Sequence, residues 1–129
     1  MMSASGRLAA CISLMAILGT AGCRGGKINR VYAVYTGGDA HRGARVIDKF
    51  RCGACHMIPG IHNADGLVGP PLIYFGRRTL IAGEVPNNPD NLVQWILSPQ
   101  SIEPHTGMPT LGLNEQEARD AAAYLYTLR

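Results

Sequence analysis

The chain has 129 residues, which is enough for one domain and little more. Its 12 Lys and Arg residues and 9 Asp and Glu residues give a formal net charge of +3, and the basic residues form no run. This balance gives no reason to expect a nucleic-acid partner.

The first 22 residues have the layout of an export signal. One basic residue, Arg7, precedes an apolar run from Leu8 to Leu18, and small residues follow. The run of 11 residues is shorter than the roughly 20 apolar residues that a membrane-spanning helix needs. We therefore expect residues 1–22 to be cleaved and the mature chain to be exported to the periplasmic side of a bacterial cytoplasmic membrane.

Cys23 directly follows Thr20-Ala21-Gly22, a sequence that resembles the cleavage box of bacterial lipoproteins. In that box the cysteine becomes the lipidated first residue, and several acyl chains would anchor it stably. Thr20 departs from the pattern, which most often has leucine there, so ordinary cleavage near the same point is the alternative.

Residues 24–38 are punctuated by glycine and lack helical periodicity. We expect residues 23–38 to be an anchor cysteine and flexible tether, and residues 39–129 to be the folded domain.

A helix is predicted after Asp39, through "AHRGARVIDKF" to Arg51. Asp39 is a suitable N-cap, and Val46, Ile47 and Phe50 fall on one face.

The following segment, from Cys52 to about Pro89, is rich in glycine and proline and predicts no long element. Loops of this length are rarely stable in a compact domain unless they wrap around something. The segment therefore indicates a bound ligand.

Two more helices are predicted towards the C-terminus. Asp90 is the expected cap of a short helix through "NLVQWILS" that Pro99 ends. Asn114 and Glu117 have the spacing of a capping box before the helix "EQEARDAAAYLYTL". The apolar stripe of this last helix consists of Ala118, Ala121, Ala122, Leu125 and Leu128. The fold class is thus all-α, with three or four helices and too few large aliphatic side chains to fill a core unaided.

Cys52, Cys55 and His56 form a Cys-x-x-Cys-His sequence, the pattern of c-type haem attachment. Two thiols at this spacing can each add to one vinyl group of a porphyrin, and the backbone then brings the histidine under the iron. A disulfide would leave His56 and the long loop unexplained, and a redox dithiol would need a strand before the cysteines and a helix after them. Zinc would need ligands from a second cysteine pair. The pattern favours one covalently attached haem, which would also fill the core.

An iron bound to His56 has a second axial ligand or an open position. The candidates are Met57, Met108, His41, His62 and His105. Met57 directly follows His56 and is held to the same side of the ring. Met108 lies 52 residues beyond His56 in the loop "PHTGMPTLG", from which it can reach the far face. We predict His56 and Met108 as the ligands, with His105 as the nearest rival and a core-filling role as the alternative for Met108.

From Gly38 to Arg129 the sequence resembles the small single-haem class I cytochromes c. The resemblance rests on "CGACH", "GMP", "VGPPL" and "ARDAAAYLYTL", and it implies a small cytochrome c fold around one haem. The combination of "VGPPL", "IAG", "PNNPDNLVQWI" and "ARDAAAYLYTL" is similar to exported bacterial cytochromes associated with haem-copper terminal oxidases.

The resemblance also implies roles for further residues. The carbonyl of Pro70 would accept the ring N–H of His56, and Trp95 would lie against the haem. Gly43 and Tyr124 would bring the first and last helices into close contact. Near the haem propionates the resemblance places Tyr74, Arg77 and Arg78.

By this resemblance the protein would be an electron carrier and not an enzyme, with no small-molecule substrate. It would pass single electrons between exported or membrane-bound redox proteins of a respiratory chain, with a terminal oxidase, a quinol-oxidising complex or a dehydrogenase as partner. The alternatives are a cytochrome subunit of a dehydrogenase or oxidase complex and a peroxidase-type haem enzyme with an open iron site.

Overall fold

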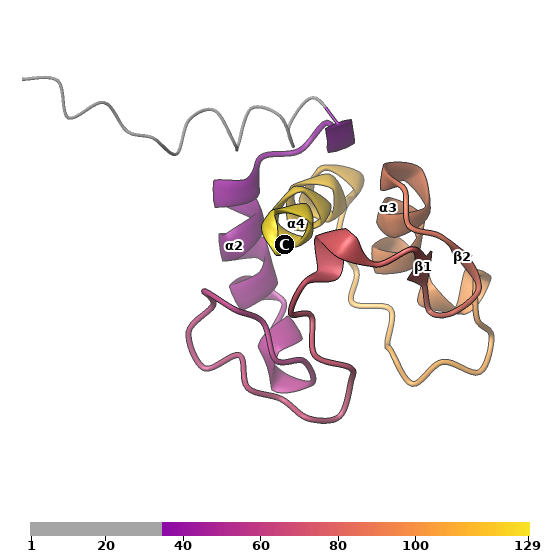
Figure 1. Cartoon of the computed structure of the whole chain (residues 1–129), viewed down its shortest axis with the longest axis horizontal. Coiled ribbons are helices and arrows are strands. Elements are labelled where there is room, and N and C mark those ends of the chain that lie inside the picture. Colours follow the sequence, from indigo (N-terminus) through magenta and orange to yellow (C-terminus); the bar gives the residue numbers. More distant parts are fainter. Residues whose placement is uncertain (1–34) are drawn as a thin grey trace, which may run out of the picture.

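The computed structural model describes residues 35–129, which form a mainly helical domain with very little sheet (Figure 1). Its α-helices are α2 (Ala40–Lys49), α3 (Pro89–Leu97) and α4 (Glu115–Thr127). Short 3₁₀ turns lie at Cys52–Ala54 (η1), Phe75–Arg77 (η2) and Pro99–Ser101 (η3). A two-stranded antiparallel hairpin joins β1 (Leu80–Ile81) to β2 (Val85–Pro86), with Leu80 opposite Pro86. Within this part of the chain, no helix is both long and apolar enough to cross a membrane.

Helix α2 begins as predicted, because the side chain of Asp39 accepts a 2.8 Å hydrogen bond from the backbone N–H of Arg42. The helix ends at Lys49, two residues before the predicted end. Arg51 adopts a left-handed conformation with φ 57°, which ends the helical path and starts η1.

The predicted cap of α3 was wrong. Asn88, not Asp90, caps this helix, and its side chain accepts a 2.9 Å hydrogen bond from the N–H of Asn91. Proline is favoured at the first helical position because its φ is already helical and its missing N–H has no helical partner there. Pro89 therefore starts the helix and places Asp90 inside the first turn.

Helix α4 has the predicted capping box. The Asn114 side chain accepts from the N–H of Glu117 at 2.9 Å, and the Glu117 carboxylate accepts from the N–H of Asn114 at 3.0 Å. Four residues of the predicted stripe are buried and Leu128 is partly buried. This helix thus presents a small-residue face to the rest of the domain.

Helices α2 and α4 cross closely at Gly43, as predicted. A Cβ atom on Gly43 would lie 2.0 Å from the carbonyl oxygen of Asp120 and 2.9 Å from Cβ of Tyr124. Asp120, 3% exposed, binds the guanidinium of Arg42 through both carboxylate oxygens at 2.8 and 2.9 Å and accepts the N–H of Asp39 at 2.7 Å.

The long middle segment has little regular structure, as predicted, and packed structure begins before Asp39. Thr36 is buried, and a Cβ on Gly38 would lie 2.1 Å from the carbonyl oxygen of Arg119. The end of the segment expected to be a tether therefore packs against α4.

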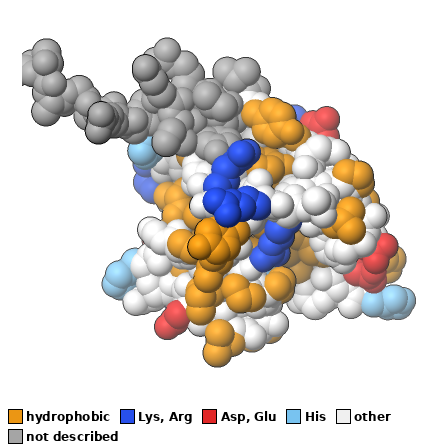
Figure 2. All heavy atoms as spheres, in the orientation of Figure 1, with side chains coloured by type: hydrophobic (Ala, Val, Ile, Leu, Met, Phe, Trp, Pro, Cys, Tyr) orange, Lys and Arg blue, Asp and Glu red, His pale blue; other side chains and the backbone are white. Residues whose placement is uncertain are grey.

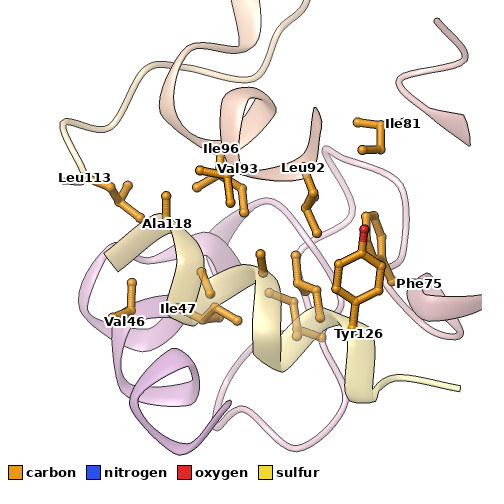
Figure 3. Packing of buried hydrophobic residues seen from close by; sticks show 14 of the residues in the cluster. Val46, Ile47, Phe75, Ile81, Leu92, Val93, Ile96, Leu113, Ala118 and Tyr126 are labelled. Atoms are coloured by element: carbon orange, nitrogen blue, oxygen red, sulfur yellow. The ribbon is translucent and has the colours of Figure 1, made fainter. Parts of the chain in front are cut away.

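The core joins all of these elements. Figure 3 shows Val46 and Ile47 of α2 close to Ala118 of α4, with Tyr126 beside Phe75 at the other end of the cluster. One side of this core opens into a cavity.

Candidate functional site

The cavity has a volume of about 340 Å³ and lies between the helices and the middle loops. Most of its lining is apolar, and side chains come from α2, α3, α4 and every loop between them. The charged side chains in this lining are Arg51 and Arg78. Cavities of this size and polarity are typical of cofactor sites.

Cys52 and Cys55 both line the cavity and are partly buried free thiols. The turn that carries them is closed by the N–H of His56, which donates to the carbonyl of Cys52 at 3.0 Å. Gly53 lets this turn pack, since a Cβ there would lie 2.5 Å from Cβ of Ala64. Burial raises the pKa of the Cys52 thiol, and the neighbouring Cys55 acts in the same direction.

His56 also lines the cavity, and the hydrogen bond predicted for it is present. Its Nδ1 lies 2.8 Å from the carbonyl oxygen of Pro70. A carbonyl can only accept, so Nδ1 carries a proton, and in the neutral imidazole Nε2 is then the nitrogen with the lone pair. This is the tautomer that a metal-binding imidazole needs, and the bond fixes the orientation of the ring.

Gly69 was missed as a site residue by sequence reasoning. A Cβ at this position would lie 2.3 Å from Cε1 and 2.6 Å from Nδ1 of His56, so only glycine leaves room for the ring. Its own N–H donates to the carbonyl of Cys55 at 2.8 Å. The sequence feature that could have identified it is its position in "VGPPL", directly before Pro70.

Met108 lines the same cavity. The loop around it is held by the side chain of Gln100, which donates to the Met108 carbonyl at 2.8 Å, and by Thr106, whose hydroxyl accepts from the Met108 N–H at 3.2 Å. Trp95 lines the cavity from α3. The other candidates for a second axial position do not line it: Met57, His41, His62 and His105.

Of the three residues expected near the propionates, only one lines the cavity. Arg78 lines the cavity, donates to the carbonyl of Pro71 and packs 5.4 Å from the ring centre of Phe75. Tyr74 and Arg77 are outside the cavity lining and exposed.

Asn87 is a second supporting residue that the sequence did not single out. Its side-chain amide donates to the carbonyls of Phe75 and Arg78 at 3.2 and 3.0 Å, and its oxygen accepts from the hydroxyl of Tyr126 at 2.9 Å. Burial raises the pKa of Tyr126, which therefore stays a neutral donor. Asn87 thus ties the cavity wall at η2 to helix α4.

Tyr124 supports the site from the other side of α4. Its hydroxyl donates to the carbonyl of Pro59 at 2.6 Å, in the loop that follows His56, and burial raises the pKa of this phenol. Helix α4 therefore contacts both α2 and the attachment loop.

These donors fit a covalently attached haem. Two thiols, an imidazole with a free Nε2 and a thioether surround one apolar cavity, which is the donor set of a c-type haem with His and Met ligands. In residues 35–129, no three His, Cys, Asp or Glu side chains gather in a way that could hold a metal ion. A redox dithiol would need a strand before the cysteines and a helix after them, whereas here a helix precedes Cys52 and a single 3₁₀ turn starts at it.

Comparison with known proteins gives one family. The cytochrome c family model matches residues 40–129. The chain is 35% identical over 91 residues to cytochrome c oxidase subunit 2 of Alkalihalophilus pseudofirmus and 32% identical over 94 residues to that of Bacillus sp. strain PS3. Each of these matches covers 70% of this chain and 26% of the relative.

A third relative, cytochrome c oxidase subunit 2 of Bacillus subtilis, is 29% identical over 89 residues, covering 67% of this chain and 25% of the relative. The aligned part of this chain thus spans about a quarter of the length of these curated relatives. No solved structure matched significantly.

Proposed function

The chain belongs to the cytochrome c family, and from that premise we propose that it is an electron carrier with a single covalently attached haem c. Cys52 and Cys55 would hold the haem through thioether bonds, and His56 and Met108 would bind its iron. The observation that carries the proposal is the convergence of these four side chains on one apolar cavity. When bound, the haem supplies the chemistry of the function, a one-electron change between ferric and ferrous iron.

The chain's own residues would set the conditions for that change. Pro70 orients His56 and increases the electron donation of the imidazole through the 2.8 Å hydrogen bond. Met108 is a soft, neutral donor that favours ferrous iron and so raises the reduction potential. Trp95 and the aliphatic lining exclude water.

The partner that the comparisons favour is a terminal oxidase, because the relatives are named as oxidase subunits. A quinol-oxidising complex or a dehydrogenase would present the same kind of redox surface. Contact would be brief, since redox proteins dock through small interfaces.

The site of action would be the periplasmic side of the cytoplasmic membrane, with Cys23 as a lipid anchor after removal of residues 1–22. These residues lie outside the described part of the chain. The layout of the first 23 residues supports this part of the proposal.

A second candidate function is that of a cytochrome subunit in a stable oxidase complex. The relatives' greater length favours it, because their cytochrome-like part is one portion of a larger subunit. Purification in mild detergent from its own membranes separates the two. A carrier is recovered alone, whereas a subunit is recovered in fixed ratio with other chains.

Two spectra test the main proposal on protein made in cells that mature c-type cytochromes. Haem should stay with the chain after denaturation, and the native oxidised protein should show the charge-transfer band of an iron–thioether bond. The matched control is Cys52→Ala/Cys55→Ala, which should carry no covalent haem. Retention of haem by the denatured control would show that the attachment site is elsewhere, and absence of the band in the native protein would reopen the peroxidase-type alternative.

A further inference from the structure

One face of the domain, around η2 and the end of α4, combines exposed apolar and basic side chains away from the cavity. We call it the tyrosine–arginine face, and its residues are Tyr35, Ile73, Tyr74, Arg77 and Arg129. Tyr35 and Tyr74 are each 57% exposed and Ile73 is 39% exposed. Both arginines are exposed as well.

The contacts within this face hold its parts together. The guanidinium of Arg77 lies 5.0 Å from the ring centre of Tyr74. Tyr35 and Phe75 pack edge-on against Tyr126 of α4 at 5.6 and 6.3 Å between ring centres.

The residues that follow α4 are joined to the same place. The N–H of Gly76 donates to the carbonyl of Leu128 at 2.9 Å, and a Cβ on Gly76 would lie 3.1 Å from Cγ of Arg129. Figure 2 shows basic side chains directly beside large hydrophobic ones in the middle of the visible face, with acidic side chains only towards its edge.

The backbone at Tyr74 is strained, with φ 56° in the left-handed region that a bulky residue rarely adopts. Such a conformation is unfavourable for a residue other than glycine and persists where the surroundings impose it. Here the strain is not repaid by burial of the ring, because most of it faces solvent. The backbone therefore displays an aromatic side chain outward at a cost in stability.

The sequence segments that carry and precede the face contain charges of one sign. Residues 66–83, which carry most of the face, contain two arginines and no acidic residue. The segment 24–34, which leads to Tyr35, contains three more basic residues and again no acidic one. The acidic residues nearest to segment 66–83 in the sequence are Asp65 and Glu84, which adjoin it on either side.

We propose that the tyrosine–arginine face lies on an anionic membrane surface. Tyrosine is favoured at the level of lipid headgroups, and each Lys or Arg close to an anionic leaflet adds attraction. The inference rests on the membrane-anchoring part of the proposed function. Twelve residue steps separate Cys23 from Tyr35 and span at most about 43 Å, so an anchored domain would stay within this distance of the bilayer, and Tyr35 is the residue of the face nearest to the anchor in the sequence.

Such a contact would orient the redox site. Leu72, Phe75 and Arg78 belong to the same segment as the face, and all three line the cavity. A bilayer against the face would therefore fix the direction in which the cavity meets partners embedded in the membrane.

The test uses the Cys23→Ser chain, purified as the leader-free exported holoprotein, so that no lipid anchor contributes. It is sedimented with vesicles of phosphatidylcholine alone or with one third phosphatidylglycerol, and bound protein is read on gels and by haem absorbance. The test variant is Tyr74→Ser/Arg77→Gln. The matched control is Leu67→Ser/Arg45→Gln, which also removes one arginine and one exposed apolar side chain, with Leu67 82% exposed and Arg45 on α2.

We expect binding to the anionic vesicles only, lost at high salt, about tenfold weaker in the Tyr74/Arg77 variant and unchanged in the control. Absence of binding, or equal weakening in both variants, would overturn the proposal. Unchanged vesicle binding by the Tyr74/Arg77 variant would also overturn it, and a loss of electron transfer in that variant would then assign the face to an acidic protein partner. Protein that binds without haem absorbance would leave this inference standing while the proposed function failed.

Discussion

At the scale of single residues, the orientation of His56 depends on the absence of a side chain at Gly69. The φ of Gly69 is not in the left-handed region, so alanine is acceptable to the backbone, and the conflict is purely steric. We expect Gly69→Ala to displace the ring of His56, break its bond to Pro70 and lower the free energy of unfolding by about 1–3 kcal/mol. Guanidinium unfolding and the reduction potential measure the two effects.

The control for Gly69→Ala is Leu67→Ala in the same loop. Leu67 is 82% exposed, so its truncation should change the unfolding free energy by no more than about 0.5 kcal/mol and leave the potential unchanged. If both variants had the same unfolding free energy and the same reduction potential, the loop would have to accommodate the added Cβ without moving His56.

Met108 is the residue whose replacement should change the electronic properties of the site most. Histidine is a harder donor than a thioether, so Met108→His should lower the reduction potential, by on the order of a hundred millivolts or more. The control is Met57→His, because Met57 does not line the cavity. A potential that stays the same in Met108→His, measured by redox titration, would remove Met108 from the iron.

At the scale of elements, the closest packing is the crossing of α2 and α4 at Gly43. Alanine in an exposed helix interior would be about 1 kcal/mol more stable than glycine. At Gly43 the added Cβ would meet the Asp120 carbonyl at 2.0 Å, so the helices must separate. We expect Gly43→Ala to lower the unfolding free energy by about 1–3 kcal/mol, measured by denaturant titration of the holoprotein, and a gain in stability would show that the crossing is looser than described.

Asp120 links the same two helices and makes that link dependent on pH. Burial alone would raise the pKa of this carboxyl, but hydrogen bonds from Arg42, the Asp39 N–H and Gln116 outweigh it and leave the pKa lowered. A lowered folded pKa contributes stability above the unfolded value of about 3.9, and this stability is lost as pH falls through the folded pKa.

The corresponding experiment compares wild type with Asp120→Asn in denaturant titrations from pH 6 to pH 3. The stability difference should be largest at pH 6 and should shrink below about pH 4, as the wild-type carboxyl is protonated. Taking the difference between the two proteins cancels other titrating groups, including Glu117, whose pKa is lowered mainly by Lys49. A difference that is constant over this range would exclude a titrating link at Asp120.

The elements were largely predictable because their signals are local. The capping box at Asn114 and the N-cap at Asp39 are set by residues within one turn, and both were predicted correctly. Asp90 was assigned wrongly because it and Asn88 are both good caps, and the decisive residue was Pro89 between them. The ion pair of Arg42 with Asp120 joins residues 78 positions apart and has no local signal.

At the scale of the whole molecule, the cavity explains why a domain with so long an irregular segment is arranged as it is. The Cys-x-x-Cys-His sequence and the Met108 loop could be singled out because each is a short, distinctive sequence, and residues of both line one cavity. The roles of Asn87 and Tyr126, which support the cavity wall, could not be identified from the sequence, because these two residues act through a hydrogen bond between distant positions. The sequence has too few large aliphatic side chains to fill its core, and the resulting cavity is where the Cys-x-x-Cys-His sequence and the Met108 loop meet.

The last prediction concerns the molecule's place in the cell. If Cys23 carries acyl chains, Cys23→Ser should move the protein from the membrane fraction to the soluble exported fraction, because several chains anchor a protein stably and no other strong anchor is proposed. Cell fractionation followed by haem staining measures this, with Cys11→Ser as control because Cys11 lies within the segment expected to be removed.

The tyrosine–arginine face predicts how the released protein depends on salt. Released Cys23→Ser protein should still associate weakly with the membranes at low salt and leave them at high salt, whereas attachment that survives high salt would mean that another subunit holds the domain.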